Sequence, residues 1–114
     1  MPALTDPVVR AKIHHALSNW RFTGYVVWRQ VAEEWVRREL DYHTTTRIGE
    51  LMFEHVRAGG RIDQVEETRP EHSSFRYHYD FRLSVEGRLV YLETVLDDDD
   101  PDDPTITVVN AHEA

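Results

Sequence analysis

The 114-residue chain, with a mass of 13.4 kDa, is 40% hydrophobic and 30% charged, which is typical of one globular domain spanning residues 1–114. It contains no cysteine, which excludes disulfide bonds, thiolate metal sites and a cysteine nucleophile. No apolar run approaches the ~20 residues needed to span a bilayer, and the N-terminus lacks the pattern of a secretory signal, so we expect a cytoplasmic protein without a membrane partner.

The net charge of −8 is distributed unevenly along the chain. Residues 1–60 carry eight Lys or Arg and seven Asp or Glu, a balance of +1, whereas residues 61–114 carry five Arg and fourteen Asp or Glu, a balance of −9. Six of these acids lie in the segment DDDDPDD, residues 97–103. This acidity argues against general binding of phosphate backbones, although a local cationic pocket is compatible with it.

The N-terminal half, about residues 6–59, predicts three helices. The first begins at Asp6–Pro7, because Asp can accept an unpaired backbone N–H and Pro has none to satisfy, and it ends near residues 18–19. Apolar residues at helical spacing predict the second helix over residues 25–40. The third lies within residues 42–60, where threonines offer an N-cap and Gly59–Gly60 a stop. A DNA-binding helix-turn-helix is not favoured, because this last segment has only two arginines and strands follow it.

The C-terminal half, about residues 61–112, predicts a sheet. Its segments either alternate between apolar and polar residues or are rich in β-branched and aromatic residues, which places strands at 61–69, 74–85, 88–96 and 105–112. Glu86–Gly87–Arg88 predicts a tight hairpin turn, and the acidic segment 97–104 a loop. The expected fold is therefore α+β, with three N-terminal helices packed on one face of a four-stranded antiparallel sheet.

The segment FRYHYDFRL, residues 75–83, alternates two kinds of side chain. One row is apolar and is expected to pack against the helices: Phe75, Tyr77, Tyr79, Phe81 and Leu83. The other row is expected on the open face of the sheet: Arg76, His78, Asp80 and Arg82. Residues from the other strands can join that face: Glu67, Arg69, Tyr91, Glu93 and His112.

A base, a proton donor and cations on one sheet face are sufficient to cleave RNA without a metal. A carboxylate or imidazole takes the 2′-hydroxyl proton, a guanidinium stabilises the phosphorane charge, and an imidazole protonates the leaving oxygen. The candidate catalytic residues are therefore Arg76, His78, Arg82 and Glu93, with RNA as the candidate substrate and no cofactor.

The order of elements, helices and then an antiparallel meander over most of the chain, resembles the microbial-ribonuclease and toxin group typified by barnase, RelE and MqsR-like mRNA interferases. The residue types on the open face resemble that group as well. The resemblance implies a toxin-like, metal-independent ribonuclease that uses Arg76, His78, Arg82 and Glu93. The acidic bias departs from the basic character of such toxins. The segments GGRIDQV and VVNAH also resemble small uncharacterised bacterial proteins, which implies little about activity.

A second interpretation is that the polar row is an ordinary solvent-exposed sheet face with cross-strand ion pairs. The protein is then a non-catalytic acidic binding module, antitoxin-like or immunity-like, with a basic protein partner, or a homodimer joined through a strand edge. The charge around His78 discriminates between the ribonuclease and the binding module. A positive pocket of Arg69, Arg76 and Arg82 favours the ribonuclease, whereas ion pairs with Asp80 and Glu93 favour the binding module.

Motifs for metals and phosphates are sparse. His78 and Asp80 lie two apart on a strand and can converge on one ion, with Glu93 or His112 as a third ligand. HExxH is absent, and the run of aspartates lacks the Gly and Glu positions of an EF-hand. None of the five glycines forms a phosphate-binding loop. The sequence motifs therefore predict no dedicated metal site.

Overall fold

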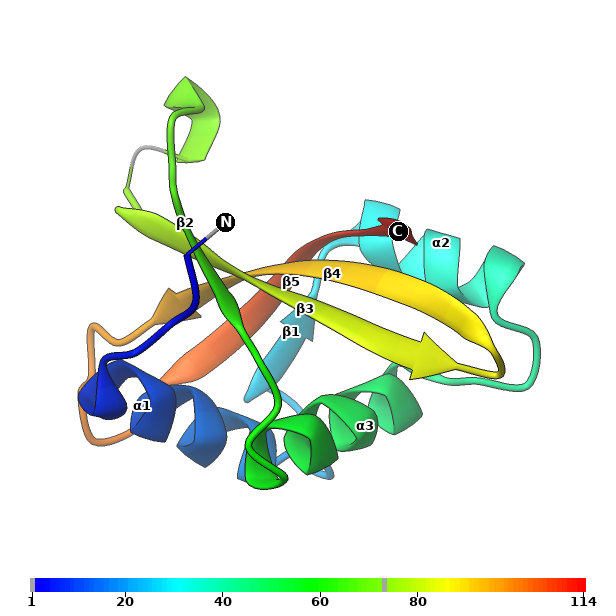
Figure 1. Cartoon of the computed structure of the whole chain (residues 1–114), viewed down its shortest axis with the longest axis horizontal. Helices are drawn as coiled ribbons and strands as arrows, with labels where there is room; N and C mark the ends of the chain where they lie inside the picture. The colour runs from blue at the N-terminus through cyan, green and yellow to red at the C-terminus, as the bar shows by residue number, and fades with distance from the viewer. Residues whose placement is uncertain (1, 73) are drawn as a thin grey trace.

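The computed structural model describes residues 2–72 and 74–114. Within them lie three α-helices and a five-stranded mixed sheet with the strand order β1-β5-β4-β3-β2 (Figure 1). The bounds are α1 (Pro7–Ser18), β1 (Val26–Trp28), α2 (Gln30–Glu39), α3 (Thr45–Arg57), β2 (Asp63–Glu66), β3 (Tyr77–Val85), β4 (Arg88–Asp97) and β5 (Thr105–Glu113), with a 3₁₀ turn η1 (Pro70–His72) after β2. The predicted α+β class and the three helices are confirmed.

Two helices begin as their capping residues predict. Asp6 accepts a hydrogen bond from the Val8 backbone N–H at 2.9 Å, and α1 follows directly. Thr44 Oγ1 accepts from the Arg47 N–H at 3.0 Å at the start of α3. The third helix ends just before Gly59, whose φ of +80° is the left-handed conformation that glycine adopts most readily.

The prediction of one helix over residues 25–40 is wrong, because the segment divides into β1 and α2. Val26 pairs with Ile106 in a parallel ladder between β1 and β5, and the Arg29 N–H donates to the Val108 carbonyl at 3.0 Å. The β-branched and aromatic residues before Arg29 suit a strand. The helix therefore begins only at Gln30, and Ala32 and Val36 form its buried side.

The remaining strands form the predicted meander, with β2–β3, β3–β4 and β4–β5 all antiparallel. The β3–β4 hairpin turns at Glu86 and Gly87, whose φ angles of 51° and 79° are both positive, as in a type I′ turn. The prediction of four antiparallel strands is wrong, because β1 adds a fifth, parallel strand at the edge of the sheet. The first predicted strand is also shorter than expected, four residues rather than 61–69.

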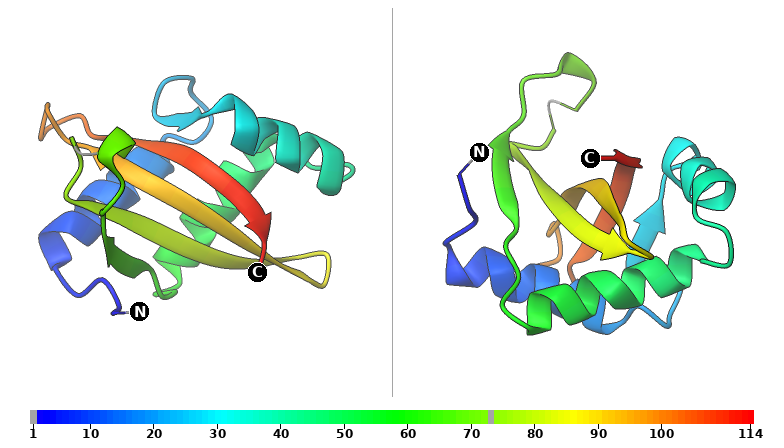
Figure 2. Two further views of the ribbon diagram at one scale, coloured as in Figure 1. Left: turned by 90° about the horizontal axis from the view of Figure 1, so that it is seen from above. Right: turned by 45° about the vertical axis from the view of Figure 1, so that its right-hand side comes forward.

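One face of the sheet is covered by α1 and α3, which lie side by side, whereas α2 lies beside β5 near the edge that β1 forms (Figures 1 and 2). The buried side of α1 presents Ile13 and Leu17, and that of α3 presents Ile48 and Met52. Among the row predicted to pack against the helices, Tyr79, Phe81 and Leu83 are buried in the core, and Tyr77 is partly buried against it. Phe75 is half-buried and precedes β3.

The edge formed by β2 is partly closed by the N-terminal segment. Leu4 N donates to the Ile62 carbonyl at 2.8 Å, and Gln64 N donates to the Pro2 carbonyl at 2.9 Å. The chain after β2, which carries η1, then rises beside the open face before it returns as β3 (Figure 1). This excursion brings Arg69 over the open face, where it contacts a residue of β4.

Candidate functional site

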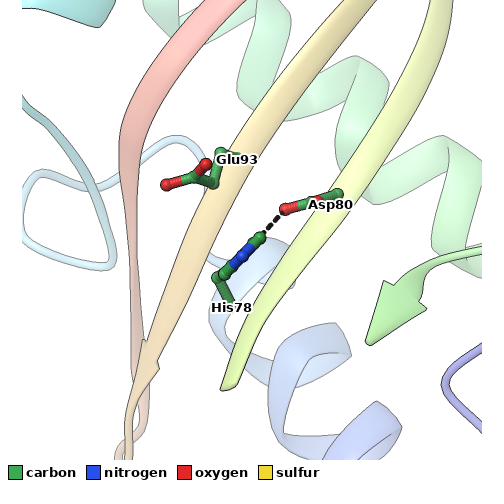
Figure 3. Close-up of side chains that lie close together, drawn as sticks. All are labelled: His78, Asp80 and Glu93. Atoms are coloured by element: carbon green, nitrogen blue, oxygen red, sulfur yellow. Dashed lines mark hydrogen bonds and ion pairs between the residues drawn. The ribbon is translucent and has the colours of Figure 1, made fainter. Parts of the chain in front are cut away.

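The open face of the sheet carries a buried polar cluster instead of a uniformly wet surface. Asp80 on β3 lies directly opposite Glu93 on β4 in the strand register. Only 1% of Asp80 and 7% of Glu93 is exposed to solvent. His78 precedes Asp80 by two residues and lies on the same face (Figure 3). A β-bulge interrupts the β4–β5 ladder directly after Glu93, and bulges are common beside functional sites.

Asp80 is held by two hydrogen bonds. His78 Nδ1 lies 2.7 Å from Asp80 Oδ1, and the Tyr91 hydroxyl donates to Asp80 Oδ2. Burial raises the pKa of Asp80 above its ordinary value, although the hydrogen bonds from Tyr91 and His78 act in the opposite direction. Burial, together with the hydrogen bond to Asp80, also raises the pKa of Tyr91, so its hydroxyl remains a donor.

Glu93 is held by Arg69, which also binds Glu67. The guanidinium donates to both Glu67 carboxylate oxygens at 2.9 Å each and to Glu93 Oε2 at 2.5 Å. The Glu67 side chain is only 1% exposed. Its hydrogen bonds with Arg69 lower the pKa of Glu67 to about 2. This guanidinium therefore stabilises two buried carboxylates at once.

Arg82 is held by a third carboxylate. Its Nη1 donates to Asp63 Oδ2 at 2.5 Å, and Arg61 Nε donates to Asp63 Oδ1 at 2.7 Å. Burial acts to raise the pKa of Asp63, but Arg61 and Arg82 outweigh it and the pKa lies below its ordinary value. The Arg82 guanidinium also lies 5.6 Å from the centre of the Tyr91 ring.

The four residues predicted to be catalytic do not form one constellation. His78 and Glu93 lie together, with ligand-type atoms within 4.8 Å of each other. Arg82 is close by but bound to Asp63. Arg76 is exposed and lies outside β3, with its guanidinium 5.1 Å from the centre of the Tyr77 ring.

Other open-face candidates also have defined places. Arg69 and Glu67 belong to the network around Glu93, and the His112 ring stacks on Tyr91 with centroids 4.6 Å apart. Asp63 was missed from the sequence. The signal for it was available, because Asp63 lies two residues from Val65 on a short strand, and in the sheet these two residues pair with Asp80 and His78 and share their face.

Three residues of the cluster can hold a metal ion. His78, Asp80 and Glu93 each offer one ligand atom, and these atoms all lie within 4.8 Å of one another. Figure 3 shows the three side chains together on one face of β3 and β4. Imidazole and carboxylate groups of this kind also serve as a general base or acid.

Comparisons with known proteins identify no relative. No family model, curated protein or solved structure matches the chain. No helix among the described residues has the length and hydrophobicity required to cross a bilayer. The function must therefore be argued from the geometry of the chain itself.

Proposed function

We propose that the protein is a non-catalytic binding module that recognises a positively charged protein partner. The observation that carries this proposal is the pairing of the open-face guanidiniums. Arg69 is bound by Glu67 and Glu93, and Arg82 by Asp63. A phosphodiester substrate needs cations that are free to receive it, and these two are already occupied. This is the outcome that favours binding over RNA cleavage.

The excess charge available for recognition is negative. In the loop between β4 and β5, Asp98 is paired with Lys12 at 2.8 Å and Asp103 lies 4.0 Å from His15. The other four aspartates of the acidic segment 97–103, which begins at the last residue of β4, have no ion pair within residues 2–72 and 74–114, and all are exposed: Asp97, Asp99, Asp100 and Asp102. Complementary charge accelerates association and selects partners by sign. An acidic protein with this surface fits a basic partner, as an antitoxin-like or immunity-like protein does.

The test is titration of the full chain with a defined cationic probe, an arginine-rich peptide of about ten residues, followed by tryptophan fluorescence or calorimetry. The first variant replaces the four unpaired aspartates of the loop with asparagine. The matched control removes four other exposed acids that make no ion pair within the described chain: Glu34→Gln, Asp41→Asn, Glu54→Gln and Glu66→Gln. Both variants change the net charge by the same amount.

The expected result is saturable binding that weakens as salt is added, that the loop variant loses and that the control retains. If both variants bind the peptide equally weakly, binding depends only on the net charge of the protein. That result would overturn the proposal. Cleavage of RNA by the wild type, abolished by His78→Ala, would overturn it in favour of catalysis.

One observation favours a second candidate function, a metal-independent ribonuclease. His78 Nδ1 is hydrogen-bonded to Asp80 Oδ1 at 2.7 Å, an arrangement that orients the imidazole and leaves its other nitrogen for proton transfer. Glu93 lies beside it as a second base. In this function His78 and Glu93 transfer the protons, and Arg82 and Arg76 must move to receive the phosphate charge.

The two functions separate in an assay of fluorescent RNA with excess EDTA. A metal-independent ribonuclease cleaves under these conditions, and His78→Ala loses the cleavage while remaining folded by circular dichroism. Growth arrest after induced expression, relieved by His78→Ala with Arg82→Ala, gives the same answer in cells. No cleavage and no arrest overturn the ribonuclease, and the peptide titration then decides the binding module.

A further inference from the structure

We propose that His78, Asp80 and Glu93 form a binding site for one first-row transition-metal dication such as Zn²⁺ or Mn²⁺. The site goes beyond the proposed recognition of a basic partner and does not depend on it. It rests on the placement of three ligands, on the charge of the buried cluster and on donor atoms that the surrounding chain does not use.

The placement of the ligands comes from the sheet itself. His78 and Asp80 lie two apart on β3, and Glu93 lies opposite Asp80 on β4, so adjacent strands fix all three positions. Their ligand atoms lie within 4.8 Å of one another. A tetrahedral ion with bonds of ~2.1 Å places its ligands about 3.4 Å apart. Metal binding therefore requires the three side chains to rotate toward one another, and Asp80 Oδ1 must exchange its contact with His78 Nδ1 for the ion.

The buried cluster carries more negative charge than its arginines neutralise. Four carboxylates have side chains that are 10% exposed or less: Asp63, Glu67, Asp80 and Glu93. The guanidiniums bound to them number three among the described residues: Arg61, Arg69 and Arg82. Like charges directly opposite each other on adjacent strands are destabilising. The carboxylate without a guanidinium is Asp80, and a cation beside it supplies the missing charge.

Donor atoms in the cluster remain available to an ion. Within residues 2–72 and 74–114, Glu93 Oε1 and His78 Nε2 have no hydrogen-bond or ion-pair partner. No fully buried side-chain nitrogen or oxygen among these residues lacks a partner, so both atoms are open to solvent and to an ion. Arg69 occupies the other oxygen of Glu93, and Tyr91 holds Asp80. Residues that hydrogen-bond to metal ligands in this way orient them and are typical of metal sites in proteins.

The ligand set determines which metals fit. One imidazole with two carboxylates suits Zn²⁺ or Mn²⁺, whereas Ca²⁺ and Mg²⁺ prefer a shell made only of oxygen. Three protein ligands leave a coordination position for water. The three ligands are buried or half-buried, whereas the aspartates of the acidic segment 97–103 are exposed, so the two are different environments for an ion.

The test is calorimetry of the full chain, treated with EDTA and dialysed, against Zn²⁺, Mn²⁺ and Mg²⁺ separately. The expected result is one Zn²⁺ or Mn²⁺ per chain, with Mg²⁺ bound at least ~10-fold more weakly. His78→Gln and Glu93→Gln are each expected to weaken binding by ~10-fold or more. Two variants are expected to retain it: His112→Gln, on the same face, and the loop variant in which Asp97, Asp99, Asp100 and Asp102 are asparagine.

Circular dichroism of each metal-free variant shows that it is folded. His78→Gln is the decisive variant because His78 is only partly buried and, within residues 2–72 and 74–114, its side chain makes a single hydrogen bond, to Asp80. No metal binding by the wild type would overturn the site. Metal binding by both His78→Gln and Glu93→Gln with the affinity of the wild type would overturn it as well. Loss of binding in the loop variant alone would assign the ion to the acidic loop and overturn the site as well.

Discussion

Asp80 and Glu93 face each other directly across β3 and β4, and both are buried. Two carboxylates in this arrangement repel each other and have lost their hydration. Each is compensated differently, Asp80 by His78 and Tyr91, and Glu93 by Arg69. The stability of the open face therefore depends on a few identifiable side chains, and Arg69 is the one that serves two carboxylates.

We expect Arg69→Met to lower the free energy of unfolding by about 2–4 kcal/mol, because Glu67 and Glu93 then stay buried without their cation. The lower part of this range applies, since about a third of the guanidinium is exposed. Urea denaturation measures the loss. The control is Arg37→Met, which breaks the exposed pair with Glu33 and is expected to cost less than about 0.5 kcal/mol. Equal midpoints for the two variants would contradict this prediction.

The pH dependence of stability is expected to depend on Glu67. Its pKa is about 2 in the folded chain, against an ordinary value of 4.5. Between these values the unfolded chain binds more protons than the folded chain, so stability falls as the pH falls. The contribution of Glu67 is fully present above pH 4.5 and is lost as the pH approaches 2.

The measurement is the difference in unfolding free energy between wild type and Glu67→Gln, followed as the pH is lowered through this window. It is expected to shrink with acid. The same difference measured in an Arg69→Met background is expected to vary much less with pH, because Arg69 is the main cause of the lowered pKa. A difference that stays constant in the wild-type background would contradict the assignment.

Neighbouring residues determine some elements of the fold, and pairing with distant residues determines others. The start of α1 at Asp6 and the hairpin at Glu86–Gly87 could be predicted because neighbouring residues determine them. The strand β1 could not, because its three residues are ordered by pairing with β5 at the far end of the chain. Without that partner, Val26–Trp28 reads as the first turn of the helix that follows.

On the open face, too, part of the arrangement follows from local sequence and part from distant pairing. Alternation along residues 75–83 predicted which side chains share a face, and His78, Asp80 and Arg82 do share one. Alternation could not predict how deeply each of these side chains is buried. Asp80 is buried on an inner strand between β2 and β4, where the Tyr91 hydroxyl bonds to it, and Arg82 turns to Asp63 because β2 lies beside β3. These contacts come from strand order, which alternation does not encode.

Gly59 and Gly60 are expected to resist substitution for different reasons. Gly59 has a φ of +80° and open space around an added Cβ, so Gly59→Ala costs about 1 kcal/mol of unfolding free energy through the backbone alone. A Cβ on Gly60 would overlap the His55 ring, whose Nε2 lies 2.7 Å from the Arg61 carbonyl. Gly60→Ala therefore costs about 1–3 kcal/mol through displacement of that ring.

Two further variants separate these causes in thermal unfolding. Asparagine tolerates the left-handed conformation, so Gly59→Asn is expected to be more stable than Gly59→Ala. His55→Ala is expected to relieve the cost of Gly60→Ala but not that of Gly59→Ala. If both alanine variants respond alike to His55→Ala, the assigned contact with the ring is wrong.

Glu86 is expected to be a position where substitution stabilises the protein. Its φ of 51° places a non-glycine residue in the left-handed region at the first turn position of the β3–β4 hairpin. That conformation costs roughly 1–2 kcal/mol for most residues and less for asparagine. Glu86→Asn creates the Asn-Gly pair preferred in type I′ turns and is expected to raise the unfolding free energy by about 0.5–1 kcal/mol.

The matched control is Glu86→Gln, which removes the charge that lies 4.0 Å from His43 but keeps the unfavourable backbone conformation. It is expected to leave the urea midpoint almost unchanged, because exposed ion pairs contribute little. A gain in Glu86→Gln as large as that in Glu86→Asn would trace the effect to charge. A gain in Glu86→Asn alone assigns it to the turn, and so to the hairpin that holds Asp80 opposite Glu93.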